Sequence, residues 1–122
     1  SPDNCAIDPL GRLWVSTDGN DDTGAADGLW ALETHGEGRG TGRHFFRCPV
    51  GAELCGPRFN EAGDALFLAV QHPGDTEGAS FEAPGTRWPD FQPDMPPRPS
   101  VIRPRLSLNL IAAAVRGGPL RA

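Results

Sequence analysis

The chain has 122 residues, a length that limits it to one small domain or to a piece of a larger protein. Its 16 Gly and 13 Pro indicate many turns and exclude a protein built from long helices. The net charge of −5 lies in an acidic body, since all 16 acidic residues precede Pro96; this argues against nucleic acid as the main partner and is compatible with divalent cations.

The first half of the chain alternates short strands with turns. In the turn Asp8-Pro9-Leu10-Gly11, Pro presets one backbone dihedral and Gly accepts the conformation at the exit. An acidic loop at 18–27 separates the second strand from the third. Strands are predicted, in chain order, at 5–8, 13–17, 28–32 and 44–49. Four antiparallel strands in this order predict one blade of a β-propeller.

The hairpin pattern occurs a second time, with predicted strands at 54–59 and 65–70. Ile7 aligns with Phe59 and Gly11 with Gly63, at a spacing of roughly fifty residues, which is the size of one propeller blade. The predicted fold class is therefore all-β, a partial β-propeller of about one and a half blades.

The rest of the chain loses this periodicity. Six of the 13 Pro fall between Pro84 and Pro99, within a long loop that carries three aromatic side chains and is expected to lie over a larger body. A last short strand is predicted at 100–102 and a short helix at 106–115, whose apolar stretch is too short to span a bilayer.

Three segments follow from this organisation. Residues 1–72 form the propeller blades, 73–101 the Pro-rich closing loop with the last strand, and 102–122 an atypical basic and apolar tail. One and a half blades cannot close a ring, because sheet faces and an edge stay exposed. We therefore expect the chain to be the C-terminal part of a larger propeller, and to be inactive by itself.

The two hairpins place oxygen ligands at their open ends. Asp3 and Asn4 come near Asp18 in the first hairpin, and Glu53 stands at the corresponding end of the second. Hard cations such as calcium bind carboxylate and carbonyl oxygens of this kind, often from loops. The alternative is that Asp and Asn are present because they favour turns, and that Glu53 is a solvated loop residue.

Cys55, Gln71 and His72 lie at the same end of the second hairpin. His72 follows an apolar strand and is a candidate metal ligand, phosphate donor or general acid, although a lone His at a strand end most often has none of these roles. Cys55 is either a thiolate ligand or a small buried strand residue, and the second role is favoured. Cys48 and Cys55 either form a disulfide or are buried thiols, with the thiols favoured.

Several motifs together resemble the PhoX family of bacterial alkaline phosphatases. They are Ser1-Pro2-Asp3-Asn4, Gly11-Arg12-Leu13-Trp14-Val15 with Thr17-Asp18-Gly19, Gly51-Ala52-Glu53 with Cys55-Gly56-Pro57, Ala69-Val70-Gln71-His72-Pro73-Gly74, Trp88-Pro89-Asp90-Phe91 and Pro97-Arg98-Pro99-Ser100-Val101. Each motif alone is weak, but their order is fairly specific. The resemblance covers residues 1–101, and the tail that follows Val101 has no counterpart in this family.

The resemblance implies a secreted, monomeric phosphomonoesterase with a β-propeller fold, acting on small phosphate esters in the periplasm or outside the cell after twin-arginine export. It implies an active site that holds calcium together with iron. By matching motifs, Glu53 and Asp3 are metal-ligand candidates with Asp18 and Asn4 beside them, and His72 and Gln71 lie toward the substrate or support the ligands.

Two other functions remain open from the residues. One is a non-catalytic propeller segment that serves as an interaction scaffold. The other is a gluconolactonase-like propeller hydrolase, whose repeats share the pattern Asp-Pro-x-Gly-x-Leu-Trp-Val seen from Asp8 to Val15.

Overall fold

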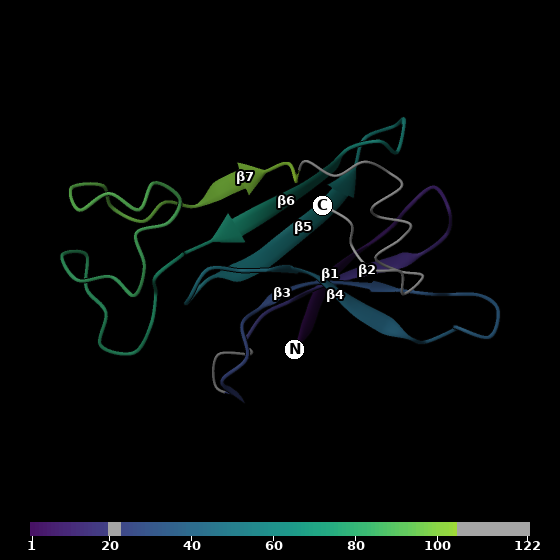
Figure 1. Ribbon diagram of the computed structural model, residues 1–122, viewed down its shortest axis with the longest axis horizontal. Helices are drawn as coiled ribbons and strands as arrows, with labels where there is room; N and C mark the ends of the chain where they lie inside the picture. The colour runs from purple at the N-terminus through teal and green to yellow at the C-terminus, as the bar shows by residue number, and fades with distance from the viewer. Residues whose placement is uncertain (20–22, 105–122) are drawn as a thin grey trace, which may run out of the picture.

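The structure is a computed structural model that describes residues 1–19 and 23–104, and these residues form seven antiparallel strands without a helix (Figure 1). The strands are β1 (Pro2–Ile7), β2 (Leu13–Thr17), β3 (Gly28–Leu32), β4 (Gly42–Arg47), β5 (Glu53–Phe59), β6 (Leu66–Gln71) and β7 (Ser100–Ile102). The all-β class is thereby confirmed. The helix predicted at 106–115 lies outside the described residues.

The strands form two sheets that follow the chain order. The first sheet has the order β1-β2-β3-β4 and the second the order β5-β6-β7. The predicted strands at 13–17, 28–32 and 100–102 have the observed bounds. The others are shifted, most of all β1, which begins at Pro2 instead of Cys5 because Pro2 pairs with Thr17 of β2.

Alternating side chains explain why these short segments form strands. In β2, Trp14 and Ser16 are completely buried, whereas Leu13 and Val15, which alternate with them, are only half-buried. In β6, Leu68 is buried and its neighbour Phe67 is exposed. A period of two is the signature of strands with one face on a core.

The two hairpins have equivalent turns, as the repeat predicts. The amide of Gly11 donates to the Asp8 carbonyl at 2.9 Å, and that of Gly63 donates to the Asn60 carbonyl at 3.0 Å. Both glycines have a positive φ, 81° and 70°, which a side chain would disfavour. Asp8 and Asn60 therefore hold corresponding places, with a buried carboxylate in the first turn and an exposed amide in the second.

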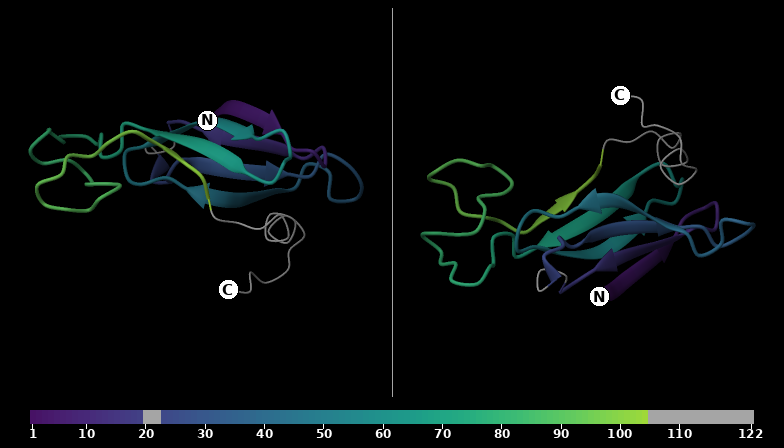
Figure 2. Two further views of the ribbon diagram at one scale, coloured as in Figure 1. Left: turned by 90° about the horizontal axis from the view of Figure 1, so that it is seen from above. Right: turned by 60° about the horizontal axis from the view of Figure 1, so that its bottom comes forward.

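The two sheets share one hydrophobic core. A backbone amide of β5, that of Gly56, donates to the Asn4 side-chain oxygen of β1 at 3.0 Å, so the first strands of the two sheets are joined directly. Figure 2 shows the strands of both sheets running alongside one another. The core cluster consists of Trp14, Leu29, Ala31, Cys48, Ala52, Leu54, Leu66, Leu68 and Val70.

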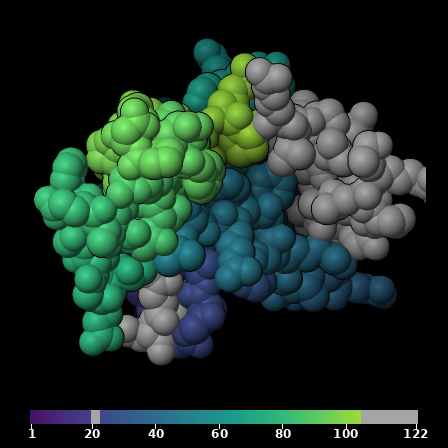
Figure 3. All heavy atoms as spheres, turned by 60° about the vertical axis from the view of Figure 1, so that its left-hand side comes forward, coloured from purple at the N-terminus to yellow at the C-terminus, as the bar shows by residue number. Residues whose placement is uncertain are grey.

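The Pro-rich segment 73–99 packs beyond one end of the sheets, and Figure 3 shows it in green as a lobe beside them. Of its aromatic residues, only Trp88 packs against the core, while Phe81 and Phe91 are 74% and 65% exposed. Trp88 thus attaches the segment to the core, and the placement of the loop over a larger body stays a prediction. No helix of the described residues is long and apolar enough to cross a membrane.

Candidate metal centre

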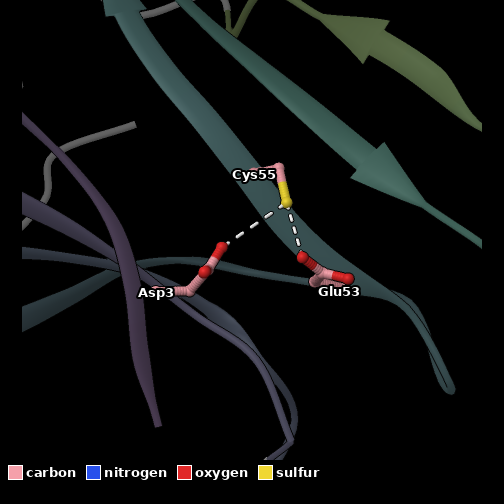
Figure 4. A group of neighbouring side chains, drawn as sticks. All are labelled: Asp3, Glu53 and Cys55. Carbon is pink, nitrogen blue, oxygen red and sulfur yellow. Dashed lines mark hydrogen bonds between the residues drawn. The ribbon is translucent and has the colours of Figure 1, made fainter.

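The junction of the two sheets brings together three side chains with metal-binding atoms. The thiol of Cys55 donates to Glu53 Oε1 at 2.6 Å and lies 3.6 Å from Asp3 Oδ2 (Figure 4). One ligand atom from each of the three residues lies within 4.8 Å of the other two. Asp3 is exposed, and Glu53 and Cys55 are half-buried. We call this group the junction cluster.

Local strand geometry explains this meeting. Glu53 and Cys55 are two residues apart on β5, so their side chains leave the same face of the strand. Asp3 comes from β1, whose pairing with β2 shifts register between Pro2 and Cys5. The pairing of β5 with β6 also shifts register just after Cys55. Such bulges change the direction of side chains and are frequent next to functional sites.

Gln71 and His72 at the end of β6 hold the two half-buried members of the cluster. Gln71 lies opposite Glu53 in the ladder and donates from Nε2 to the Cys55 sulfur at 2.6 Å. The His72 ring places Nε2 at 3.2 Å from Glu53 Oε2 and Nδ1 at 3.1 Å from the Gly51 carbonyl. The backbone of His72 has a positive φ of 31°, an uncommon conformation that turns the chain at this point.

The electrostatics of the junction cluster keep its thiol protonated. Burial, followed by the hydrogen bond and the negative charge of Glu53, raises the pKa of Cys55 to about 12. Burial would lower the pKa of His72, but its hydrogen bonds to Glu53 and Gly51 and the nearby carboxylates outweigh this and raise it. Negative charge thus accumulates at the cluster, which favours a nearby cation.

Two of the predicted ligands lie near the junction cluster without being part of it. The Asn4 side-chain oxygen accepts the Gly56 amide, so it links the two sheets. The backbone of Asp18 exchanges hydrogen bonds with Ser1 at the open end of the first hairpin, and the Asp18 carboxylate is not among the clustered groups. Metal binding by Asn4 and Asp18 stays a prediction.

The sequence pattern favours a small buried strand residue at Cys55 over a metal ligand. All three cysteines lie in the described residues, and none of them forms a disulfide. Cys48 is buried, as predicted for the thiols, but Cys5 is exposed and Cys55 is half-buried with its sulfur between carboxylates. The position of Cys55 two residues after Glu53 is the signal that could have placed it on the ligand face.

The ligand set of the junction cluster fits a divalent cation in part. Two carboxylates and a thiol offer three protein ligands, and thiolates favour transition metals such as iron. Calcium takes six to eight oxygen ligands, so these three side chains would supply only a fraction of a calcium shell. The cluster thus resembles one wall of a metal centre.

Comparisons with known proteins identify the family. The family model described as alkaline phosphatase PhoX matches residues 1–74 of the 122. The solved structure of Pseudomonas fluorescens PhoX in complex with vanadate, a transition state analogue, is 30% identical and superposes with a TM-score of 0.68. That match covers 84% of this chain and 17% of the other.

No curated protein shows a significant match. The structural match confirms the expected partial propeller, in which the two sheets are consecutive blades. It also confirms the family predicted from the ordered motifs. The chain belongs to the PhoX family of alkaline phosphatases.

Proposed function

We propose that this chain supplies one wall of the active site of a metal-dependent phosphomonoesterase, with the junction cluster as a metal-binding group. The observation that carries the proposal is the convergence of Asp3 and Glu53 from consecutive blades, in a chain of an alkaline phosphatase family. The relative's complex with vanadate, a transition state analogue, supports phosphoryl transfer as the reaction class. The remaining ligands belong to other parts of the full-length protein.

Each residue of the cluster has a distinct task in this proposal. Asp3 and Glu53 hold a metal ion through carboxylate oxygens, and a bound ion stabilises charge on a phosphoryl group. His72 fixes the orientation of Glu53 through its 3.2 Å contact, as residues behind metal ligands commonly do. Because both ring nitrogens of His72 already contact protein groups, His72 acts as a positioning residue in this proposal.

The proposal extends to the metal ions, the substrate, the oligomeric state and the location of the full-length protein. The ions are calcium and iron, the substrate is a small phosphate ester, and the full-length protein is a monomer of the periplasm or cell exterior, exported by the twin-arginine route. The acidic body of the chain supports a cation-binding protein and does not favour nucleic acid as a partner.

Glu53→Gln in the full-length protein tests this function. Replacing one carboxylate oxygen by an amide nitrogen removes an anionic ligand while keeping the shape of the side chain. Because even residues behind the ligands cost 10–100-fold in metal affinity, we expect affinity to fall by about 100-fold or more. The measurements are metal content by mass spectrometry and turnover of p-nitrophenyl phosphate.

Glu61→Gln is the matched control, since Glu61 is an exposed residue in the turn at the opposite end of the β5–β6 hairpin. This variant should keep both its metal and its activity. A folded Glu53→Gln protein with unchanged metal content and turnover would contradict the proposal. Lactone hydrolysis without phosphatase activity in the unmodified protein would support the gluconolactonase-like alternative instead.

A further inference from the structure

We propose that Cys55 binds the metal of the junction cluster as a thiolate and makes this site prefer borderline or soft divalent cations, such as Fe²⁺, Co²⁺ and Cd²⁺, over Ca²⁺. The inference rests on the proposed function, because it assigns a further ligand to the same site. Two carboxylates alone would not give the site this preference, since carboxylates suit calcium and magnesium whereas thiolates suit transition metals.

The position of the sulfur favours metal binding by Cys55. Cys55 Sγ lies 2.6 Å from Glu53 Oε1 and 3.6 Å from Asp3 Oδ2, and Figure 4 shows it pointing toward both carboxylates. Metal–sulfur and metal–oxygen bonds of about 2.3 and 2.1 Å in a tetrahedral shell place the two ligand atoms roughly 3.5 Å apart. The sulfur and Asp3 Oδ2 already have this spacing. A rotation of the Glu53 side chain would bring its carboxylate oxygen to the same distance from the sulfur.

The single proton of the thiol cannot serve both neighbouring carboxylates. A thiol carries one hydrogen, so Cys55 can donate to Glu53 or to Asp3 but never to both at once. When the proton points toward Glu53, the exposed Asp3 carboxylate faces the half-buried sulfur at 3.6 Å without an intervening proton. A cation held between the three groups removes this conflict, because it attracts both carboxylates and the thiolate together.

A hydrogen-bond donor lies behind the sulfur. Gln71 Nε2 donates to Cys55 Sγ at 2.6 Å, from the neighbouring strand. Hydrogen bonds to ligating sulfur are among the means by which proteins tune metal–thiolate sites. Gln71 thus orients the Cys55 sulfur, as His72 orients the Glu53 carboxylate.

The binding step is balanced without any change of oxidation state. A divalent cation forms a bond to Sγ, the S–H bond breaks, and the proton passes to a buffer base. Because only deprotonated sulfur binds metal, each ion bound through Cys55 releases one proton that a site of two carboxylates would not release.

The experiment titrates the full-length protein with Co²⁺ and follows the thiolate-to-metal charge-transfer absorption, with calorimetry to count bound ions and Ca²⁺ as competitor. Cys5→Ser is the matched control, since Cys5 is an exposed thiol on β1 and lies outside the junction cluster. We expect the absorption band in the unmodified protein and in Cys5→Ser. Cys55→Ser should lose this band, and its preference for Co²⁺ over Ca²⁺ should fall by at least about tenfold.

A second measurement needs no substituted protein. In the unmodified protein, Co²⁺ should further lower the alkylation rate of Cys55, which is already slow because its thiol is protonated, while leaving the rate of Cys5 unchanged, as read by peptide mass spectrometry. Equal absorption in Cys55→Ser, or Co²⁺ bound without protection of Cys55, would overturn this inference while leaving the proposed function intact. Binding of neither ion near the cluster would overturn both.

Discussion

Trp14→Ala is expected to lower the free energy of unfolding by about 3–5 kcal/mol, the usual cost of removing a large aromatic side chain from a core. Trp14 is completely buried on β2. Its ring meets that of Phe45 edge-on at 4.9 Å in the first sheet and that of Phe59 at 5.5 Å in the second. The substitution would thus open a cavity where the two blades meet.

Trp30→Ala provides the comparison for this prediction. Trp30 lies on the neighbouring strand β3 of the same sheet, but it is 38% exposed and stacks on His44 with a centroid distance of 4.6 Å. Its loss should cost clearly less than the loss of Trp14, because part of its ring is in water and its stacking adds only about 0.5–1.5 kcal/mol beyond the area that it buries. Denaturant unfolding of the full chain measures both values, and equal losses would contradict the central place of Trp14 in the core.

Asp8→Asn is the second substitution with a large expected effect, about 3–5 kcal/mol at neutral pH, as for the loss of one partner from a buried ion pair. Asp8 Oδ2 accepts hydrogen bonds from Arg12 Nε at 2.6 Å and Trp14 Nε1 at 3.0 Å, and Oδ1 accepts the amides of Leu10 and Arg12. An amide would replace one acceptor by a donor and leave the buried Arg12 without its counter-charge.

The effect of Asp8→Asn should depend on pH. Burial by itself would raise the pKa of Asp8, but the hydrogen bonds from Trp14 and Arg12, with the Arg12 charge, outweigh it and hold the pKa below its ordinary value of 3.8. A carboxyl group with a lowered pKa stabilises the fold fully above its unfolded pKa and loses that contribution as pH falls through the folded value. The difference between the wild type and Asp8→Asn should therefore be constant near neutral pH and shrink below about 3.8.

Asp64→Asn is the control, because Asp64 belongs to the equivalent turn of the second hairpin but is exposed. It accepts only the Asn60 side-chain amide among the described contacts, at 2.6 Å. We expect a change within about 0.5 kcal/mol and little dependence on pH. A difference for Asp8→Asn that is equally small, or that is the same at pH 3 and pH 7, would contradict the role given to this turn.

The sequence predicted the fold well where local chemistry decides it. The turns at Asp8 and Asn60 have residues that favour one geometry, and the strand around Trp14 alternates with a period of two. The ends of β1 were less predictable. Pro2 and Asp3 are poor strand residues by themselves, and they are extended because β1 pairs with β2.

The candidate site was predictable only in part, because it forms between segments far apart in the chain. The hairpin register puts Glu53 opposite Gln71, and the repeat suggests that Asp3 occupies a similar end. The sequence does not show that β1 and β5 lie side by side, nor that Asp3 and Cys55 face each other. For this reason Cys55 was expected to be a buried strand residue, and the role of Asn4 in joining the blades was not foreseen.

The most direct test of the account is anomalous diffraction from crystals of the full-length protein grown with its native metals. We expect a metal peak bonded to carboxylate oxygens of both Asp3 and Glu53, at about 2.0–2.6 Å. Data on both sides of the iron absorption edge would distinguish iron from calcium at that position. Metal peaks elsewhere in the protein, with Asp3 and Glu53 bound only to protein groups or water, would contradict it.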